Sequence, residues 1–207
     1  MAAGAVCRTL LAQFGVEIGS HVVELGGIVS TPPSPIPRPL NPPADASPVR
    51  CLDPGASARM VEAIDAAKQA GYTLGGVAEV VVNGLVVGLG SHVSWDRKLD
   101  GRLARALMSI PAIKGVGIGL GFRAGDAPGS VSHDEIFVAP PGERLEAGGF
   151  TRPTNRAGGL EGGITTGEPL VLRVAKKPIS TLMTPLRSVN IDTGEEAKAQ
   201  RDRKSVV

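Results

Sequence analysis

The residues best suited to holding a ligand lie in the stretch 151–181, which reads TRPTNRAGGLEGGITTGEPLVLRVAKKPIST. Two glycine pairs stand close together in it, Gly158-Gly159 and Gly162-Gly163. Glycine allows positive φ angles and lets the backbone approach a bound group closely. Ordering so many glycines costs chain entropy, which favours a ligand-binding loop over an ordinary surface turn. A purely structural turn remains the alternative, and the pattern by itself does not name the ligand.

The other residues that could bind a ligand or take part in catalysis are isolated in the sequence. His21 lies in a β-branched segment, where a hydrogen-bonded structural histidine is more common than a ligand. The run Ser-His-Asp-Glu at 132–135 suggests acid–base chemistry, but neighbouring residues of an extended segment point to opposite sides. The glycine spacing of GIGLGF at 117–122 imitates a dinucleotide-binding loop, yet its apolar alternation predicts a strand, and we reject a Rossmann fold. Cys7 and Cys51 lack metal-ligand spacing and are expected to be reduced.

The composition narrows the class of protein. In 207 residues the apolar share is 42%, enough for a core, whereas aromatic residues make up only 3%. The formal net charge of +2 is too small for the electrostatic footprint of a nucleic-acid-binding protein. No apolar run reaches the length of a membrane span, and the first residues do not resemble a secretory signal. We therefore expect no nucleic-acid partner, no membrane insertion and a cytoplasmic location.

Periodicity predicts three helices and several antiparallel strands, hence an α+β layered domain. The expected helices cover 2–14, 57–70 with Ser57 as N-cap and Gly71 as stop, and 96–110. The expected strands are a strand or bent pair in 16–29, a hairpin at 77–90 turning at Asn83-Gly84, a strand at 114–122 that alternates Val116, Ile118, Leu120 and Phe122, an apolar strand within 151–181, and a hairpin in 184–197.

Two segments are expected to lack regular structure. Residues 31–48 contain eight prolines, which excludes a helix or a ladder and predicts an extended surface loop. Recruitment of a partner through this proline-rich loop is an alternative role for the chain. The polar residues 196–207 are expected to form a disordered tail.

Three longer motifs resemble chorismate synthase, and the similarity runs from about Ala2 to about Ala199. They are SHVSWDRKLDGRLARALMSIPAIKGV (91–116), TNRAGGLEGGITTGEPL (154–170) and RVAKKPIST (173–181). The resemblance implies one partial domain over 1–207, built as part of a layered β-α-β sandwich, and a homotetramer in the full-length family. Removing half of such a sandwich would expose apolar faces of 77–90 and 96–110, so we expect poor solubility.

The resemblance also implies the chemistry. The family converts 5-enolpyruvylshikimate 3-phosphate to chorismate by a 1,4-elimination of phosphate, with reduced FMN as cofactor and NADPH as a candidate for reducing the flavin. A site that holds such anionic groups is expected to use glycine-backed amides and basic side chains. Matched position by position, the flavin-binding residues would be Pro111, Ala112, Gly162, Lys177, Pro178, Ile179, Ser180 and Thr181.

The resemblance assigns no catalytic residue. The two histidines and the arginines that family members use for proton transfer and substrate binding lie upstream of the matched part, and none of the three histidines here takes their place. A truncated chain that binds flavin weakly and does no chemistry is therefore the alternative to the enzyme, and we expect this chain to be inactive. Within the match, Gly117 and Leu120 stand where the family usually has Glu and Asp.

Overall fold

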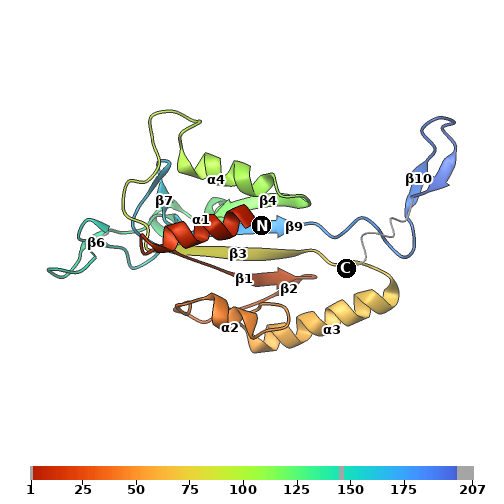
Figure 1. Ribbon diagram of the computed structural model, residues 1–207, viewed down its shortest axis with the longest axis horizontal. Helices are drawn as coiled ribbons and strands as arrows, with labels where there is room; N and C mark the ends of the chain where they lie inside the picture. The colour runs from red at the N-terminus through yellow and green to blue at the C-terminus, as the bar shows by residue number, and fades with distance from the viewer. Residues whose placement is uncertain (1, 145–146, 200–207) are drawn as a thin grey trace.

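The computed structural model describes residues 2–144 and 147–199, and it is built on one five-stranded antiparallel sheet. The strand order is β2-β1-β3-β9-β4, so the two longest strands lie near the centre (Figure 1). The strands of this sheet are β1 (Glu17–Leu25), β2 (Ile28–Val29), β3 (Gly76–Asn83), β4 (Ile113–Ile118) and β9 (Leu170–Lys176). The combination of sheet and helices confirms the expected α+β class.

Helices and short hairpins surround this sheet. The helices are α1 (Ala2–Ala12), α2 (Asn41–Asp45), α3 (Pro54–Ala70), α4 (Leu99–Met108), α5 (Gly129–Ser132) and the 3₁₀ helix η1 (Gly121–Gly125). Three two-stranded hairpins or ladders pair β5 (Phe137–Val138) with β6 (Phe150–Thr151), β7 (Leu160–Glu161) with β8 (Ile164–Thr165), and β10 (Arg187–Val189) with β11 (Glu196–Lys198). The β10–β11 hairpin projects away from the sheet in Figure 1.

The main core lies between α4 and one face of the sheet. Leu99, Leu103 and Leu107 of α4 pack against a buried cluster that includes Leu170 and Leu172 of β9. Since side chains alternate along a strand, the intervening residues of β3 and β9 point to the opposite face. A second cluster, formed by Cys51, Ala56 and Met60 with Val22, Leu25 and Ile28, fixes α3 at the β1–β2 edge.

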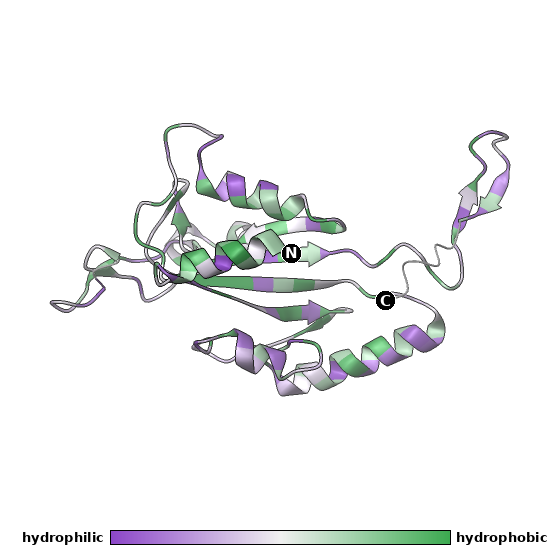
Figure 2. Cartoon of the chain, viewed as in Figure 1, coloured by the Kyte–Doolittle hydropathy of each residue, from purple (hydrophilic) through white to green (hydrophobic). Residues whose placement is uncertain are grey.

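The helix α1 has no buried side chain. Its apolar residues include Val6, which is 71% exposed, and Leu10, which is 59% exposed. Figure 2 shows these hydrophobic stretches along the helix. The face of the sheet domain that carries α1 therefore presents apolar surface.

The hairpin predicted at 77–90 is wrong, although its first half forms the strand β3. One edge of β3 pairs with β1 and the other with β9, so residues 85–90 have no edge left to pair with. They leave the sheet at Gly84 and meet β8 instead, through a bridge between Gly90 and Ile164. The apolar run predicts two strands because valines stand on both sides of the Asn83-Gly84 turn signal.

The helix predicted at 57–70 begins three residues earlier than expected. Asp53 is the N-cap, and its carboxylate accepts a 3.0 Å hydrogen bond from the Ala56 amide. Ser57 is buried within the first turns, where its hydroxyl lies 2.9 Å from that of Ser47. The stop at Gly71 is confirmed by its φ of 75°. The other two predicted helices are present, at Ala2–Ala12 and Leu99–Met108, each shorter than expected.

The proline-rich segment is not a surface loop throughout. The short helix α2 forms inside it, because Pro42 and Pro43 occupy the first turn, where no N–H is needed. Leu40 and Ala44 are buried. The Asn41 amide donates to the Ile18 carbonyl at 3.0 Å and accepts from the Ser20 amide at 3.2 Å, which fastens the segment to the outer edge of β1.

The strand predicted at 114–122 ends at Ile118. The chain turns at Gly119, where φ is 57° and an added Cβ would lie 2.1 Å from the Arg156 carbonyl oxygen. Leu120 and Phe122 therefore belong to the turn and to η1, not to the strand.

The C-terminal elements partly match expectation. The hairpin expected in 184–197 is confirmed by β10 and β11. The expected disorder is wrong for Glu196–Lys198, which form β11, and residues 200–207 lie outside the described residues. No helix within 2–144 or 147–199 is long and apolar enough to cross a membrane. The assignment of 1–207 to one domain stays a prediction.

Candidate functional site

Two of the segments predicted to bind flavin meet at one end of the sheet. Pro111-Ala112 lies between α4 and β4, and the segment Lys177–Thr181 follows β9, the strand paired with β4. The Lys177 amide donates a 2.9 Å hydrogen bond to the Ala112 carbonyl. Ala112 has a φ of 69°, a left-handed conformation that a non-glycine residue rarely adopts. The sheet thus brings together two motifs that are far apart in sequence.

The segment after β9 presents its polar groups outward. Lys177, Pro178, Ile179 and Ser180 are exposed, and Thr181 is half-buried. The Ile179 carbonyl accepts a 2.7 Å hydrogen bond from the Thr73 hydroxyl, which fixes the backbone of the segment. Within the described residues the Lys177 ammonium makes no hydrogen bond or ion pair. The donors of this segment are free to meet an incoming group.

Gly162 lies apart from this junction. The neighbouring Gly163 accepts a 2.9 Å hydrogen bond from the Leu99 amide at the start of α4, whereas Pro111 follows the end of α4. A helix of ten residues is about 15 Å long. A flavin site that includes both Gly162 and Lys177 would therefore have to extend along α4, and the shared site stays a prediction.

The two glycine pairs play different parts. A Cβ added to Gly158 would lie 2.3 Å from the Gly119 amide nitrogen. A Cβ added to Gly159 would lie 2.6 Å from the Pro169 carbonyl oxygen. Backbone packing alone requires glycine at both. At Gly162, by contrast, an added Cβ would meet no atom within 4 Å, and φ is 61°. The structural alternative thus accounts for the first pair, and Gly162 faces open space.

Asp134, from the acidic run, holds the loop that leads to these glycines. One carboxylate oxygen accepts hydrogen bonds from the Thr154 hydroxyl at 2.5 Å and the Arg156 amide at 2.8 Å, and the other accepts from the Ala157 amide at 2.9 Å. Burial raises the pKa of Asp134, but these hydrogen bonds outweigh it, and the pKa lies below its usual value. The sequence did not reveal this role, because the partners lie about twenty residues downstream.

A charged row crosses the sheet on the face opposite α4. Glu79 of β3 accepts a hydrogen bond from Nε of Arg173 at 2.7 Å, and its other oxygen lies 3.1 Å from Nε2 of His21. His21 and Glu79 are buried. Burial raises the pKa of Glu79, but the hydrogen bonds from His21 and Arg173 together outweigh that effect, so the pKa lies below its usual value. The expectation of a hydrogen-bonded, structural His21 is confirmed.

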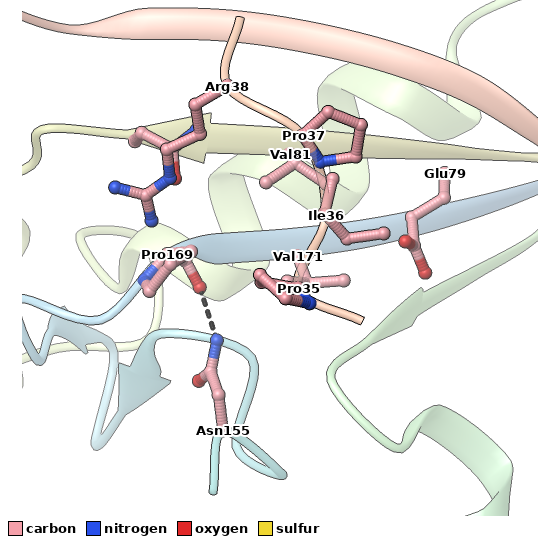
Figure 3. Close-up of a pocket in the computed structure, with 10 residues that line it drawn as sticks. Pro35, Ile36, Pro37, Arg38, Glu79, Val81, Asn155, Pro169 and Val171 are labelled. Atoms are coloured by element: carbon pink, nitrogen blue, oxygen red, sulfur yellow. Dashed lines mark hydrogen bonds between the residues drawn. The ribbon is translucent and has the colours of Figure 1, made fainter. Parts of the chain in front are cut away.

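Beside this row lies a cavity of about 560 Å³, which Figure 3 shows in close-up. Residues 35–37 of the proline-rich segment cross over Val81 and Val171, with Arg38 and Glu79 on opposite sides of the view (Figure 3). The Asn155 side-chain amide closes one wall by donating a 2.7 Å hydrogen bond to the Pro169 carbonyl. None of the predicted flavin residues lines this cavity.

The described residues hold no group of three or more His, Cys, Asp or Glu side chains that could bind a metal. Both cysteines are free; Cys7 is exposed and Cys51 is buried. A flavin requires positive charge and hydroxyl donors for its phosphate and ribityl groups. The outward-facing Lys177 ammonium and the hydroxyls of Ser180 and Thr181 are donors of that kind, so the chemistry of the segment fits the cofactor.

Comparison with known proteins points the same way. Residues 1–207 match the family model for chorismate synthase. Chorismate synthases of Brevibacillus brevis and Salinispora tropica are 53% and 55% identical to the chain over 203 and 208 residues. These matches cover 98% and 100% of the chain but 51% of each relative. A crystal structure of chorismate synthase superposes with a TM-score of 0.78 at 44% identity, covering 87% of this chain and 54% of that one. The chain thus spans about half the length of the relatives it matches.

Proposed function

Since the chain belongs to the chorismate synthase family, we propose that it serves the 1,4-elimination of phosphate from 5-enolpyruvylshikimate 3-phosphate, which yields chorismate. Its part is to supply one side of the site for reduced FMN. The single observation that supports this role is the hydrogen bond between Lys177 and Ala112, which joins the two motifs at one end of the sheet.

The residues of this junction have separate tasks. Lys177 places a positive charge where the anionic group of the cofactor would lie, and the hydroxyls of Ser180 and Thr181 donate hydrogen bonds to it. Pro111 and Pro178 restrict the backbone on either side. When bound, reduced FMN supplies electron density transiently while phosphate leaves, without net redox change. NADPH as the reductant of the flavin, assembly as a homotetramer and a cytoplasmic location belong to the same proposal.

Cofactor binding is tested by anaerobic titration of the chain with reduced FMN. We expect Lys177→Ala to weaken binding roughly tenfold, which is the loss of one charge-assisted hydrogen bond. Lys68→Ala is the matched control, because Lys68 is an exposed lysine in the last turn of α3. Equal affinity of the wild type and Lys177→Ala would refute the assignment of this segment.

A flavin-binding chain without catalytic activity is the second candidate. It is favoured by the position of His21, whose ring is buried against Glu79 and is not exposed to a ligand. An anaerobic assay with reduced FMN and 5-enolpyruvylshikimate 3-phosphate separates the two. Turnover at a rate typical of an enzyme would exclude the inactive form, and flavin binding without any phosphate release would establish it.

A further inference from the structure

A second cavity, of about 490 Å³, lies over β4 and β9 on the same face as the charged row. Glu79 lines the first cavity and Arg173 lines the second, so their ion pair stands between the two. The second cavity shares no lining residue with the predicted flavin segment. Its volume is within the range of small-molecule sites, roughly 300–1,000 Å³.

The hollow exists because alternate positions of β4 carry no side chain. Gly115 stands opposite Ala175, and Gly117 stands opposite Arg173, in the register of β4 and β9. An added Cβ at Gly117 would meet only the Gly121 Cα, at 3.5 Å, which is ordinary van der Waals contact. The fold itself therefore has room for a larger residue at position 117. Glycine there leaves a floor of bare backbone beside the Arg173 side chain.

Guanidinium N–H donors around this floor are left without hydrogen-bond partners among the described residues. Nε of Arg173 is bound to Glu79, but the side chain is 38% exposed, and its terminal nitrogens make no hydrogen bond with any residue in the described ranges. Arg123, at the rim, is exposed and its guanidinium likewise makes no contact of this kind. Glu24 is the other ionisable residue lining the cavity. Arg173 is paired with Glu79 through Nε alone, so the terminal nitrogens of Arg173 and the guanidinium of Arg123 remain available as donors to a ligand.

An aromatic surface completes the site. Phe122 lines the cavity and its side chain is 92% exposed, which is unusual for a ring of this size. Aromatic rings and guanidinium planes both stack on flat ligands. Guanidinium groups bind carboxylates through paired N–H donors.

We propose that this cavity binds a small aromatic carboxylate. The ligand ring lies over the Gly117 backbone and stacks on Phe122, and its carboxylate accepts hydrogen bonds from Arg173 and Arg123. The site would exist whether or not the chain binds flavin, since it is formed by different residues.

Benzoate is the probe, with benzyl alcohol as its uncharged analogue, and binding to the full chain is followed by saturation-transfer difference NMR. We expect saturable binding of benzoate and at least fivefold weaker binding of benzyl alcohol. Gly117→Val fills the hollow and should abolish benzoate binding, while its thermal midpoint stays equal or rises, because valine suits a strand. Arg123→Gln should weaken benzoate binding at least fivefold.

Arg105→Gln is the matched control, since Arg105 is an exposed arginine on α4, remote from this cavity. It should leave benzoate binding unchanged. The proposal is overturned if benzoate fails to saturate the wild type, if a folded Gly117→Val or Arg123→Gln binds it as tightly as the wild type, or if benzyl alcohol binds equally well. Displacement of benzoate by FMN would also overturn it, because it would assign the cavity to the cofactor.

Discussion

The amide of Lys177 donates a 2.9 Å hydrogen bond to the carbonyl of Ala112, a residue held at a φ of 69°. The left-handed conformation of Ala112 turns its carbonyl toward the end of β9. A non-glycine residue in such a conformation stores roughly 1–3 kcal/mol of strain. Strain of this kind is retained where the surrounding structure fixes it, here at the contact between two motifs.

The first prediction concerns this strained residue. Ala112→Val should lower the free energy of unfolding by about 2 kcal/mol, because a β-branched side chain is least compatible with positive φ. Reduced-FMN affinity should fall with it as the Lys177 segment is displaced. Ala112→Gly is the matched control, since it keeps the backbone conformation without strain and should retain both properties. Denaturant melts and flavin titrations measure the two effects, and a stable, flavin-binding Ala112→Val would contradict the role of this turn.

The second prediction concerns the buried carboxylate of Glu79. Glu79→Gln should lower the free energy of unfolding by about 3 kcal/mol, because it leaves Arg173 and His21 without their charged partner. Glu62→Gln, on the exposed side of α3, should change the free energy of unfolding by less than about 0.5 kcal/mol. Equal destabilisation by the two variants would show that the charged row does not stabilise the sheet.

The pH dependence of the same residue has a definite sign. The pKa of Glu79 is lower in the folded chain than the usual value of about 4.5, so its contribution is fully present above that value. The contribution is lost as the pH falls through the folded-state pKa. Wild-type stability should therefore decrease more steeply on acidification than that of Glu79→Gln. Parallel curves from urea melts at a series of acidic pH values would contradict this.

The third prediction concerns the loop anchored by Asp134. Asp134→Ala removes three hydrogen bonds, and amide hydrogen exchange at Arg156 and Ala157 should become at least tenfold faster. Glu135→Ala, a change at the exposed neighbouring carboxylate, should leave those exchange rates as they are. Unchanged protection in Asp134→Ala would mean that the glycine packing alone holds the loop.

The fourth prediction concerns the apolar surface of α1. The chain should bind a hydrophobic dye such as ANS, because large exposed apolar patches attract such probes. Replacing Val6 and Leu10 together by lysine should reduce dye fluorescence at least twofold and raise solubility, without lowering the thermal midpoint, since neither side chain is buried. Arg8→Lys on the same helix is the control. Undiminished fluorescence in the double variant would place the dye elsewhere.

The sequence allowed the elements to be predicted better than their partners. The stripe of Leu99, Leu103 and Leu107 correctly indicated α4, since helical periodicity is a local property. The hairpin at 77–90 was wrong because strand pairing is decided at a distance: β1 and β9 take both edges of β3, and β9 comes late in the chain. Local turn signals do not show which edges are already paired.

The predicted N-cap of α3, Ser57, was wrong for a different reason. Ser57 and Asp53 are both good N-caps, and the apolar periodicity begins after either. Pro54 decides between them, because proline fits the first helical position and its N–H is not needed. That signal is present in the sequence as the pair Asp53-Pro54.

The candidate site was predicted as a set of residues but not as an arrangement. The resemblance identified both Ala112 and the segment after β9, and the structure brings them into contact. It also grouped Gly162 with them, whereas Gly162 lies near the start of α4. Glycine pairs look alike in sequence whether they are closely packed against backbone, as Gly159 is, or face open space, as Gly162 does.

Asn41 has a further consequence for the association of chains. Its side-chain amide donates a hydrogen bond to the Ile18 carbonyl and accepts one from the Ser20 amide. The Arg50 guanidinium donates a 2.8 Å hydrogen bond to the Ser20 carbonyl. Exposed polar groups on a sheet margin are templates on which another polypeptide adds a strand, the first step toward fibrillar aggregates. Along this part of β1 the backbone polar groups are already hydrogen-bonded to the side chains of Asn41 and Arg50, and two prolines directly follow Asn41. The proline-rich segment therefore hinders the addition of a strand from another chain at this edge, besides connecting the sheet to α3.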